Sequence, residues 1–407
     1  MKKIFVTGRS QLSSLGLSME SFSNSLKQPA SFAEAVDINL PGSDPATIPI
    51  YSCSQDSQKI LAPSKLPLDR CSALALAAVR NLIHDTGLRL DQVDKSRLGV
   101  YWGSGMSGAA SLDQGSKAIY ADKRRIRPTS VITAMPNAPA AEIALLLGSL
   151  GPCLTFATAC ASSAVAIGEA MTAIASGRID VAVVGGSESM LSPGILASWH
   201  ALRVLANVTQ GAKGACRPFD KQRMGFALGE GAAALLIESA DHAVKHGRVP
   251  FAELSGYATN CDGHHMTNPS VQGQKAAMHS ALQHANLKPK DISYINAHGT
   301  ATSIGDLVES QSITEVFGES GVPVSSTKSL HGHLLGGGGA LELLVAIEVL
   351  VTGIAPHTVN LDELDSSISL DLIYGQPRTL TRPCHVMSNS FAFGGTNAVL
   401  IASQPEI

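Results

Sequence analysis

The sequence predicts an α/β protein with a mixed, mostly parallel sheet, built from two halves that repeat one pattern. Short β-prone runs alternate with small-residue helical runs along the 407-residue chain, which is typical of folds with a parallel sheet. The alternation starts again at Phe251 in weaker form, with no flexible linker before it. We therefore expect one body, with a first half at residues 1–249 and a second half at residues 250–407.

The first half begins with a predicted strand at residues 4–6 and a short helix at 18–25. Proline, serine and aspartate are frequent from 29 to 67, which predicts a loop with little regular structure. After this loop, helical periods alternate with short apolar runs. They predict helices at 70–85 and 138–147 and strands at 98–102, 181–186 and 232–237.

A Gly-rich turn, Gly103 to Gly108, directly follows one of these strands. Such a turn can cradle a phosphate, but the dinucleotide-binding spacing and a downstream acidic partner for the ribose are absent. We interpret the turn as the wall of a pocket.

The second half follows the same order of strands and helices. It predicts helices at 274–285, at 306–317 and from 341, and strands at 292–296, 322–325, 386–390 and 398–401. Three of its loops each end a predicted strand with reactive or turn-forming residues, at 296–302, 326–333 and 389–397.

Composition limits the possible classes of function. Hydrophobic residues make up 44% of the chain and charged residues 15%, so the chain is globular and buries a large core. A net charge of −3 provides no overall field for nucleic acid or an anionic membrane. The longest apolar helix candidate, 341–351, contains two glutamates and is shorter than the ~20 residues of a membrane span. We expect no nucleic-acid partner and no membrane span.

The seven cysteines are scattered without paired spacing, which indicates neither a zinc site nor a disulfide framework. The apolar run at the N-terminus stops after three residues, far short of a signal peptide. We therefore expect reduced cysteines, no metal and a cytoplasmic protein.

Cys160 follows a β-prone run and precedes a small-residue helix pattern. A thiol at such a junction is a candidate nucleophile, because the positive end of a helix stabilises a thiolate and lowers the pKa of the cysteine. A buried structural thiol is an equally good local interpretation. Since ligand sites gather at the carboxyl ends of strands in α/β sheets, we expect the three second-half loops to converge with Cys160.

Most of the 13 histidines are expected to be structural, including His264, His265 and His331. His298 differs because it lies between a β-run and a Gly-Thr turn. His333 differs because it precedes a Gly-rich helix start. These two histidines are the candidate partners of the cysteine.

Taken together, the motifs resemble those of elongating β-ketoacyl-acyl carrier protein synthases, the Cys-His-His condensing enzymes of the thiolase superfamily. The resemblance spans nearly the whole chain, and the number and order of the motifs make it specific. The matching segments are Val6–Gly8, Leu68–Arg70, Thr158–Ser163, Arg217–Asp220, Gly229–Gly231, Asn296–Thr300, Lys328 with Gly332-His333, and Phe393–Asn397. The resemblance implies a thiolase-like fold with layers in the order α-β-α-β-α.

The resemblance also implies a reaction. Cys160, as a thiolate, accepts an acyl group from a carrier-protein thioester. The backbone N–H groups of Cys160 and Phe393 are the implied oxyanion donors, and losing one such donor typically costs ~3 kcal/mol. His298 and His333, as neutral imidazoles, hold the enolate that forms when malonyl-carrier protein loses CO2. No cofactor is implied, because both substrates arrive on the phosphopantetheine of an acyl carrier protein.

Lys328 is expected to be buried beside this site, because a buried strand delivers it to the loop that carries His333. Glu309, on the helix after His298, is its expected ion-pair partner. The pair is expected to order the two histidines and not to transfer protons itself.

The same resemblance implies further site residues. Phe393 corresponds to the gate between the cysteine and malonyl pockets, and Phe391 and Gly394 belong to its loop. Thr300 and Thr302 resemble the hydroxyls that hold the pantetheine amides, with ordinary turn capping as the alternative.

Two more residues complete the substrate-binding set. Asn397 is expected to bind the substrate together with Thr300 and Thr302. Met106 falls where the family lines the acyl pocket, and its size would limit chain length, although a plain core methionine is equally plausible.

The chain departs from the family pattern at a few positions. Ser303 stands where proline is usual, His331 replaces a common threonine, and Ala392 replaces a glycine between two phenylalanines. Because alanine restricts backbone angles that glycine allows, Ala392 is expected to stiffen the gate. Such departures suggest a specialised pathway, for instance polyketide or polyene synthesis.

An acidic carrier protein requires a basic rim on its partner. The densest positive cluster is Lys123, Arg124, Arg125 and Arg127, with Lys65 and Arg70 elsewhere in the chain. A solvated loop face is the alternative for any one of these residues.

Two rival interpretations are weaker. A degradative thiolase needs a second cysteine in the last loop, where this chain has Phe391 and Phe393. A non-catalytic chain-length factor of the same fold would not need Cys160 and its partner residues. A catalytic chain can still require such a partner, so both a homodimer and a heterodimer remain open.

Overall fold

The computed structural model describes residues 2–39, 42, 44–53 and 67–406. Its main sheet has eleven strands in the order β13-β11-β10-β15-β16-β9-β1-β8-β6-β4-β5. The strands of the first half are β1 (Ile4–Leu12), β4 (Leu98–Gly103), β5 (Cys153–Phe156), β6 (Val181–Glu188) and β8 (Gly231–Ser239). Those of the second half are β9 (Ala252–Cys261), β10 (Tyr294–Asn296), β11 (Pro323–Ser325), β13 (Asp371–Leu372), β15 (His385–Phe391) and β16 (Thr396–Ser403).

The two halves repeat the same topology. In the first half, β1 and β6 both pair antiparallel with β8, and β4 pairs parallel with β6 and β5. In the second half, β9 and β15 both pair antiparallel with β16, and β10 pairs parallel with β15 and β11. The sheet is therefore mixed, with parallel pairing in the outer strands of each half. Antiparallel pairing of Phe5 with Glu253 and Val6 with Ala252 joins the halves.

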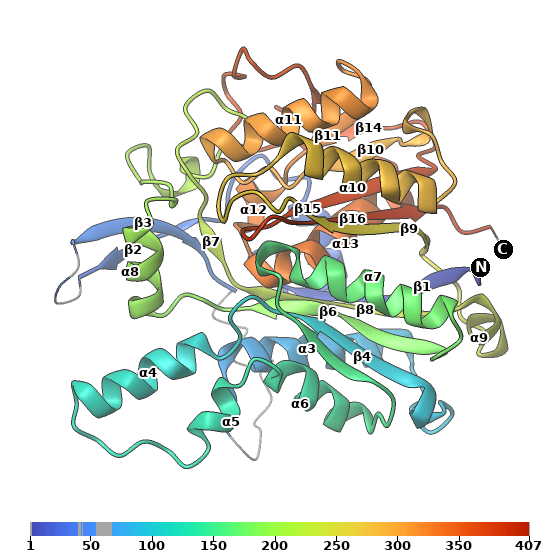
Figure 1. Cartoon of the computed structure of the whole chain (residues 1–407), viewed down its shortest axis with the longest axis horizontal. Helices are drawn as coiled ribbons and strands as arrows, with labels where there is room; N and C mark the ends of the chain where they lie inside the picture. Colours follow the sequence, from blue (N-terminus) through green and yellow to red (C-terminus); the bar gives the residue numbers. More distant parts are fainter. Residues whose placement is uncertain (1, 40–41, 43, 54–66, 407) are drawn as a thin grey trace.

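Two buried helices lie between the halves, as Figure 1 shows at the centre of the molecule. Helix α7 (Ser162–Ala175) contacts β4 and β6, and α13 (Gly338–Thr352) contacts β10 and β15. Gly339 permits their close approach, because a Cβ there would lie 2.9 Å from the backbone nitrogen of Ala164. Both helices begin at the same place, which becomes the floor of the site described below.

Helices also cover the two outer faces, which gives the predicted order α-β-α-β-α (Figure 1). Helices α3 (Arg70–Thr86) and α6 (Ala138–Leu147) pack on the first half, and α10 (Val271–His284), backed by α11 (Ser303–Phe317), packs on the second. The remaining elements are α1 (Met19–Ser25), α4 (Ala109–Tyr120), α5 (Ser130–Ala134), α8 (Pro193–Ala201), α9 (Ala240–Lys245), α12 (Lys328–His331), β12 (Ile354–Ala355) and β14 (Arg378–Thr379).

The helical stretch Leu335–Thr352 has the length and hydropathy of a membrane span. It is 89% buried inside the protein, because α13 contacts strands of both halves. Its apolar character is thus explained by the core of this fold.

The prediction of an unstructured loop at 29–67 is wrong for much of the segment that the structure describes. Strands β2 (Glu34–Ile38) and β3 (Ala46–Tyr51) form a small sheet with β7 (Leu228–Gly229). Pro49 lies inside β3, opposite Ala35 of β2, whereas Ile38, Ile48 and Ile50 bury their side chains. Residues 54–66 lie outside the described part of the chain.

Candidate active site

Cys160 lies in the short 3-10 turn Ala159–Ala161, between β5 and α7. Ala159 has a φ of +48°, a left-handed conformation that costs a non-glycine residue about 1–3 kcal/mol. Gly103, at the end of β4, lies so close that a Cβ would be 2.2 Å from the backbone nitrogen of Ser163. The end of β4 therefore packs directly against the start of α7 and supports the strained turn.

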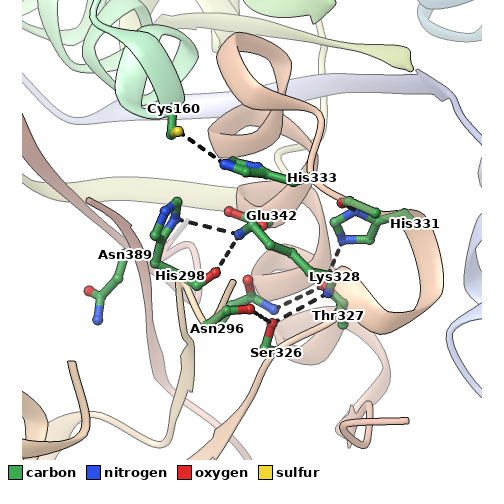
Figure 2. A network of polar contacts seen from close by, with 12 residues as sticks. Cys160, Asn296, His298, Ser326, Thr327, Lys328, His331, His333, Glu342 and Asn389 are labelled. Atoms are coloured by element: carbon green, nitrogen blue, oxygen red, sulfur yellow. Dashed lines mark hydrogen bonds and ion pairs between the residues drawn. The ribbon is translucent and has the colours of Figure 1, made fainter. Parts of the chain in front are cut away.

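Two histidines from the second half lie beside this cysteine (Figure 2). The Nε2 atom of His333 is 3.0 Å from the Sγ atom of Cys160. The ring of His298 packs edge-on against that of His333, with centroids 5.4 Å apart. The sulfur and one nitrogen of each ring lie within 4.8 Å of one another. The structure thus brings together the three residues that the sequence singled out.

The contacts of the other ring nitrogens determine which tautomers are present. The backbone N–H of Leu335 donates to Nδ1 of His333 at 3.3 Å, and the Lys328 ammonium lies 3.5 Å from Nδ1 of His298. A nitrogen that accepts a hydrogen bond carries no proton, so each neutral ring carries its proton on Nε2. Both histidines therefore present Nε2–H donors to the site.

Lys328 is fully buried, as expected, but its ion-pair partner is Glu342 of α13 and not Glu309 (Figure 2). Glu309 accepts hydrogen bonds from the backbone N–H groups of His298 at 2.8 Å and Gly299 at 2.7 Å. The predicted Lys328–Glu309 pair is therefore wrong, because both oxygens of Glu309 are occupied by the loop that carries His298. Lys328 also donates to the backbone oxygen of His298 at 2.5 Å.

Burial dominates the protonation of these groups. The pKa of His298 and that of His333 lie well below the usual value, because burial and the nearby Lys328 charge disfavour a second positive charge. Burial likewise raises the pKa of the Cys160 thiol to about 12, although Lys328 and two backbone N–H groups lower it. The net direction is thus a raised pKa, opposite to the acidity that a helix end is expected to give Cys160, and burial of the sulfur is its main cause. The resting site holds a neutral thiol and two neutral imidazoles.

Two backbone donors lie at the sulfur. The N–H groups of Phe393 and of Cys160 itself both form hydrogen bonds that lower the pKa of the thiol. They are the two groups that the sequence predicted as oxyanion donors.

The loop that carries Phe393 encloses the same site. Phe391 packs edge-on against His298 at 6.2 Å between centroids, and Phe393 stacks on Trp199 at 6.5 Å. Gly394 and Gly395 have φ values of +86° and +79°, whereas Ala392 avoids the left-handed region. Ala392 is thus unstrained in this conformation, and the two glycines provide the turn.

A cavity of about 300 Å³ opens onto Cys160. Thr300 and Thr302 line it together with both histidines, and their hydroxyl oxygens lie 3.0 Å apart. Thr302 is the N-cap residue of α11 but makes no side-chain cap hydrogen bond. The turn-capping alternative for Thr302 is therefore not realised, and its hydroxyl is available to a ligand in the cavity.

Two other predicted substrate-binding residues fit less well. Asn397 lines the cavity, but its amide donates to Asn260 at 2.9 Å and Asp262 at 2.7 Å, so it holds the loop in place. Met106 is absent from the residues that line this cavity in the described chain, and its side chain is 48% exposed. The turn 103–108 likewise contributes no wall to it.

The predicted docking residues fall into three groups. Lys123, Arg124, Arg125 and Arg127 are exposed on the connection between α4 and α5, and the three arginines line a polar cavity of about 390 Å³. Arg70 is bound to the buried Glu230, so its charge is used inside the first half and the docking prediction for it is not supported. Lys65 lies outside the described residues.

Cys160, His298 and His333 have the spacing of metal ligands, but the proton positions on the two rings decide whether they suit a cation. A metal bound at Nε2 requires the proton on Nδ1. In both rings Nδ1 already faces a donor, and Lys328 adds a positive charge beside them. The donor set therefore suits an anion and not a metal ion.

Several contributors were missed by sequence reasoning. Glu342 is one of the two glutamates inside the apolar segment 341–351, and a glutamate in such a core helix is itself a signal of a buried partner. Phe226 packs edge-on against His333 at 5.2 Å, and His265 lines the cavity. No local pattern marks either residue, because each reaches the site through the tertiary fold.

Comparisons with known proteins agree with this geometry. The family described as Beta-ketoacyl synthase, N-terminal domain, matches residues 1–243, and its C-terminal domain matches residues 251–362. Nodulation protein E of Rhizobium leguminosarum bv. trifolii is 35% identical over 407 residues, covering 99% of both chains. The 3-oxoacyl-[acyl-carrier-protein] synthase 2 of Vibrio cholerae is 33% identical over 410 residues, covering 98% of both.

A solved structure gives the same answer for the fold. A type II polyketide synthase ketosynthase, determined in complex with its acyl-carrier protein, superposes with a TM-score of 0.90 at 26% identity, covering 99% of this chain and 100% of the other. The predicted thiolase-like architecture is confirmed. The chain belongs to the beta-ketoacyl synthase family.

Proposed function

We propose that this chain catalyses decarboxylative condensation of an acyl group on Cys160 with malonyl-acyl carrier protein. The observation that supports this assignment best is the convergence of one thiol and two neutral Nε2–H donors at the end of a cavity. Decarboxylation produces an enolate, and a site with two preorganised N–H donors stabilises that charge. The bound substrates need no further cofactor for this chemistry.

In the first step, the sulfur of Cys160 attacks the carbonyl carbon of an acyl-carrier protein thioester. The C–S bond to the pantetheine breaks, and the thiol proton of Cys160 leaves with the released pantetheine sulfur. The N–H groups of Cys160 and Phe393 receive the oxyanion. Since the resting thiol is neutral, the proton is given up during attack and not beforehand.

In the second step, malonyl-carrier protein enters and loses CO2. The electron pair of the broken C–C bond forms an enolate, whose oxygen accepts hydrogen bonds from His298 and His333. The enolate carbon then attacks the acyl group on Cys160. The new C–C bond gives a β-ketoacyl thioester as the C–S bond to Cys160 breaks, and the released thiolate takes up a proton from solvent.

The surrounding charges have a supporting role in this scheme. Lys328 and Glu309 hold the loop of His298 through its backbone, and Glu342 balances the Lys328 charge. Thr300 and Thr302 would hold the pantetheine amides along the cavity. None of the three charged residues needs to exchange a proton with substrate.

The partner that delivers both substrates would be an acyl carrier protein in the cytoplasm. The basic cluster Lys123, Arg124, Arg125 and Arg127 is the proposed docking surface, because an acidic partner is attracted to clustered positive charge. Changing Lys123, Arg124 and Arg125 to Glu should weaken binding of the carrier protein in a salt-sensitive way. Unchanged affinity in a titration would remove this surface from the proposal.

A second subunit of related fold is also proposed. Of the twenty large hydrophobic residues exposed in the described chain, eleven lie between Met106 and Leu154. This segment includes β5, which is an edge strand of the main sheet, and the helices α4 and α5, which project from the body in Figure 1. An edge strand and exposed apolar side chains of this kind are stabilised by a partner. A dimer in sedimentation of the purified chain indicates a homodimer, whereas a monomer that dimerises only when a related subunit is added indicates a heterodimer. A chain that stays monomeric in both experiments would contradict the proposal.

The condensation itself is tested by supplying acyl- and malonyl-carrier protein and analysing the product by mass spectrometry. The proposal predicts a β-ketoacyl-carrier protein two carbons longer than the starting acyl chain. The alternative, a non-catalytic chain-length-factor subunit, predicts no product from this chain even beside an active partner. Catalysis is favoured because the site brings together Cys160, His298 and His333.

A further inference from the structure

Glu188, at the end of β6, is a buried carboxylate that the proposed reaction does not use. Its hydrogen-bond partners are N–H and O–H groups, and no ion pair to it is found among the described residues. Burial raises its pKa to about 7, while hydrogen bonds from the backbone of Gly105, Met106 and Gly336 lower it. A buried acid without a cation needs such donors to hold its charge.

These donors come from two turns that are far apart in sequence. The backbone N–H of Gly105 is 2.6 Å from Oε2 of Glu188, and that of Gly336 is 3.2 Å from the same oxygen. The turns also touch each other, because a Cβ on Gly336 would lie 2.2 Å from the nitrogen of Gly105. Glu188 is therefore the common acceptor at a joint between the turn after β4 and the turn after His333.

The second turn controls His333. Leu335, one residue before Gly336, has a φ of +45°, a left-handed conformation that a branched side chain rarely adopts. Its N–H donates to Nδ1 of His333, and this bond keeps the ring proton on Nε2, beside Cys160. The hydrogen bond that fixes Gly336 therefore also fixes Leu335, the strained residue whose N–H selects the tautomer of His333.

The first turn carries Met106, whose N–H lies 3.4 Å from both oxygens of Glu188. The Oγ of Ser104 donates to Oε1 of Glu188 at 3.2 Å. A carboxylate has enough lone pairs for all of these donors, whereas an amide in its place would direct an NH2 group toward some of them.

We propose that Glu188 is a positioning residue, which fixes the tautomer and place of His333 by anchoring Gly336 and Leu335 to the Ser104–Met106 turn. It touches no substrate and acts only through these backbone groups. This inference rests on the proposed function, in which His333 stabilises the enolate but is not needed for acylation of Cys160. Loss of Glu188 should therefore slow decarboxylation more than acylation.

The test compares Glu188→Gln with Glu238→Gln, a matched change of a buried glutamate that His242, Arg248 and Thr7 hold away from the site. For each variant, CO2 release from malonyl-carrier protein and acylation of Cys160 by octanoyl-carrier protein are measured separately. We expect Glu188→Gln to lower the ratio of decarboxylation to acylation about tenfold or more, as for a lost charge-assisted hydrogen bond. Glu238→Gln should leave the ratio unchanged.

A spectroscopic measurement completes the test. NMR of isotope-labelled histidine should show His333 leaving the Nε2–H tautomer in Glu188→Gln but not in Glu238→Gln. If Glu188→Gln fails to fold, Gly105→Ala disturbs the same joint, because its Cβ would lie 2.9 Å from Oε2 of Glu188. An unchanged ratio and tautomer, or equal changes in the Glu238 control, would overturn the inference. Failure of the wild type to form an acyl adduct would instead refute the proposed function.

Discussion

The two histidines of the site are held in different ways. His298 is fixed within the second half, where Glu309 accepts its backbone N–H and Lys328 donates to its backbone oxygen. His333 is fixed across the two halves, because its N–H donates to Ala227 at 2.7 Å and its oxygen accepts from Gly229 at 3.0 Å. One donor thus depends on a local charge network, and the other on the registration of the two halves.

The difference explains why both halves are needed for one site. The first half supplies the sulfur, and its segment Ala227–Gly229 also sets the distance from that sulfur to His333. The second half supplies both rings and the charges that keep them neutral. We therefore expect the two rings to contribute similarly to the rate of decarboxylation but to respond to different structural changes.

The largest expected effect is removal of either ring. His298→Ala and His333→Ala should each lower the rate of malonyl decarboxylation by about 10²- to 10⁴-fold, the usual contribution of a positioned proton donor. Acylation of Cys160 should persist in both, because its oxyanion donors are backbone groups. A variant that lost acylation to the same degree as decarboxylation would contradict this division of labour.

The charge network on the His298 side is expected to depend on Glu342 more than on Glu309. Glu342→Gln leaves Lys328 as an uncompensated buried charge and should lower the free energy of unfolding by about 3–5 kcal/mol. Glu309→Gln keeps that pair and removes one acceptor, which should cost about 1–3 kcal/mol. Denaturant unfolding of both variants measures the difference. A larger loss of stability in Glu309→Gln than in Glu342→Gln would instead indicate that Glu309 is the partner of Lys328.

Gly229→Ala should disturb only the contact between the two halves that positions His333. Its Cβ would lie 2.4 Å from the backbone oxygen of His331, and such overpacking typically costs about 1–3 kcal/mol. We expect slower decarboxylation with acylation nearly retained. Gly115→Ala, in a helix with its nearest neighbour at 3.5 Å, is the control. Equal kinetics in the two variants would show that the contact with the first half does not place His333.

The smallest effect concerns pH. Because burial raises the pKa of Cys160 to about 12, the thiolate fraction grows with pH up to that value. Alkylation of Cys160 by iodoacetamide, followed by peptide mass mapping, should therefore accelerate about tenfold per unit through pH 7 to 10. A plateau below pH 8 would instead indicate a resting thiolate, as the helix-end argument predicts.

Much of this site was predictable from the sequence, because its residues stand at the ends of strands. Cys160 and His298 each follow a β-run and precede a glycine or small-residue turn, and His333 lies in the loop after the next strand, before a Gly-rich helix start. Local patterns of that kind give the strand ends, and the α/β topology brings those ends together. The repeated order of strands in the two halves was recognisable for the same reason.

The errors have a common physical origin. The partner of Lys328 and the pKa of Cys160 depend on how deeply groups are buried and which acid reaches them, and neither quantity is encoded in local spacing. Strands β2 and β3 pair with each other locally, but this small sheet is completed by a long-range pairing of β3 with Leu228–Gly229 that no local pattern indicates. Residues such as Phe226 and Glu188 act through contacts that only the packed structure creates.

The central claim, that Cys160 carries the acyl group, is tested most directly by intact-mass spectrometry after incubation with acyl-carrier protein. The account predicts one acyl adduct on the wild type and none on Cys160→Ala. That variant should remain folded, since a small side chain replaces a small one. Absence of the adduct from the wild type, or its persistence in Cys160→Ala, would contradict the account.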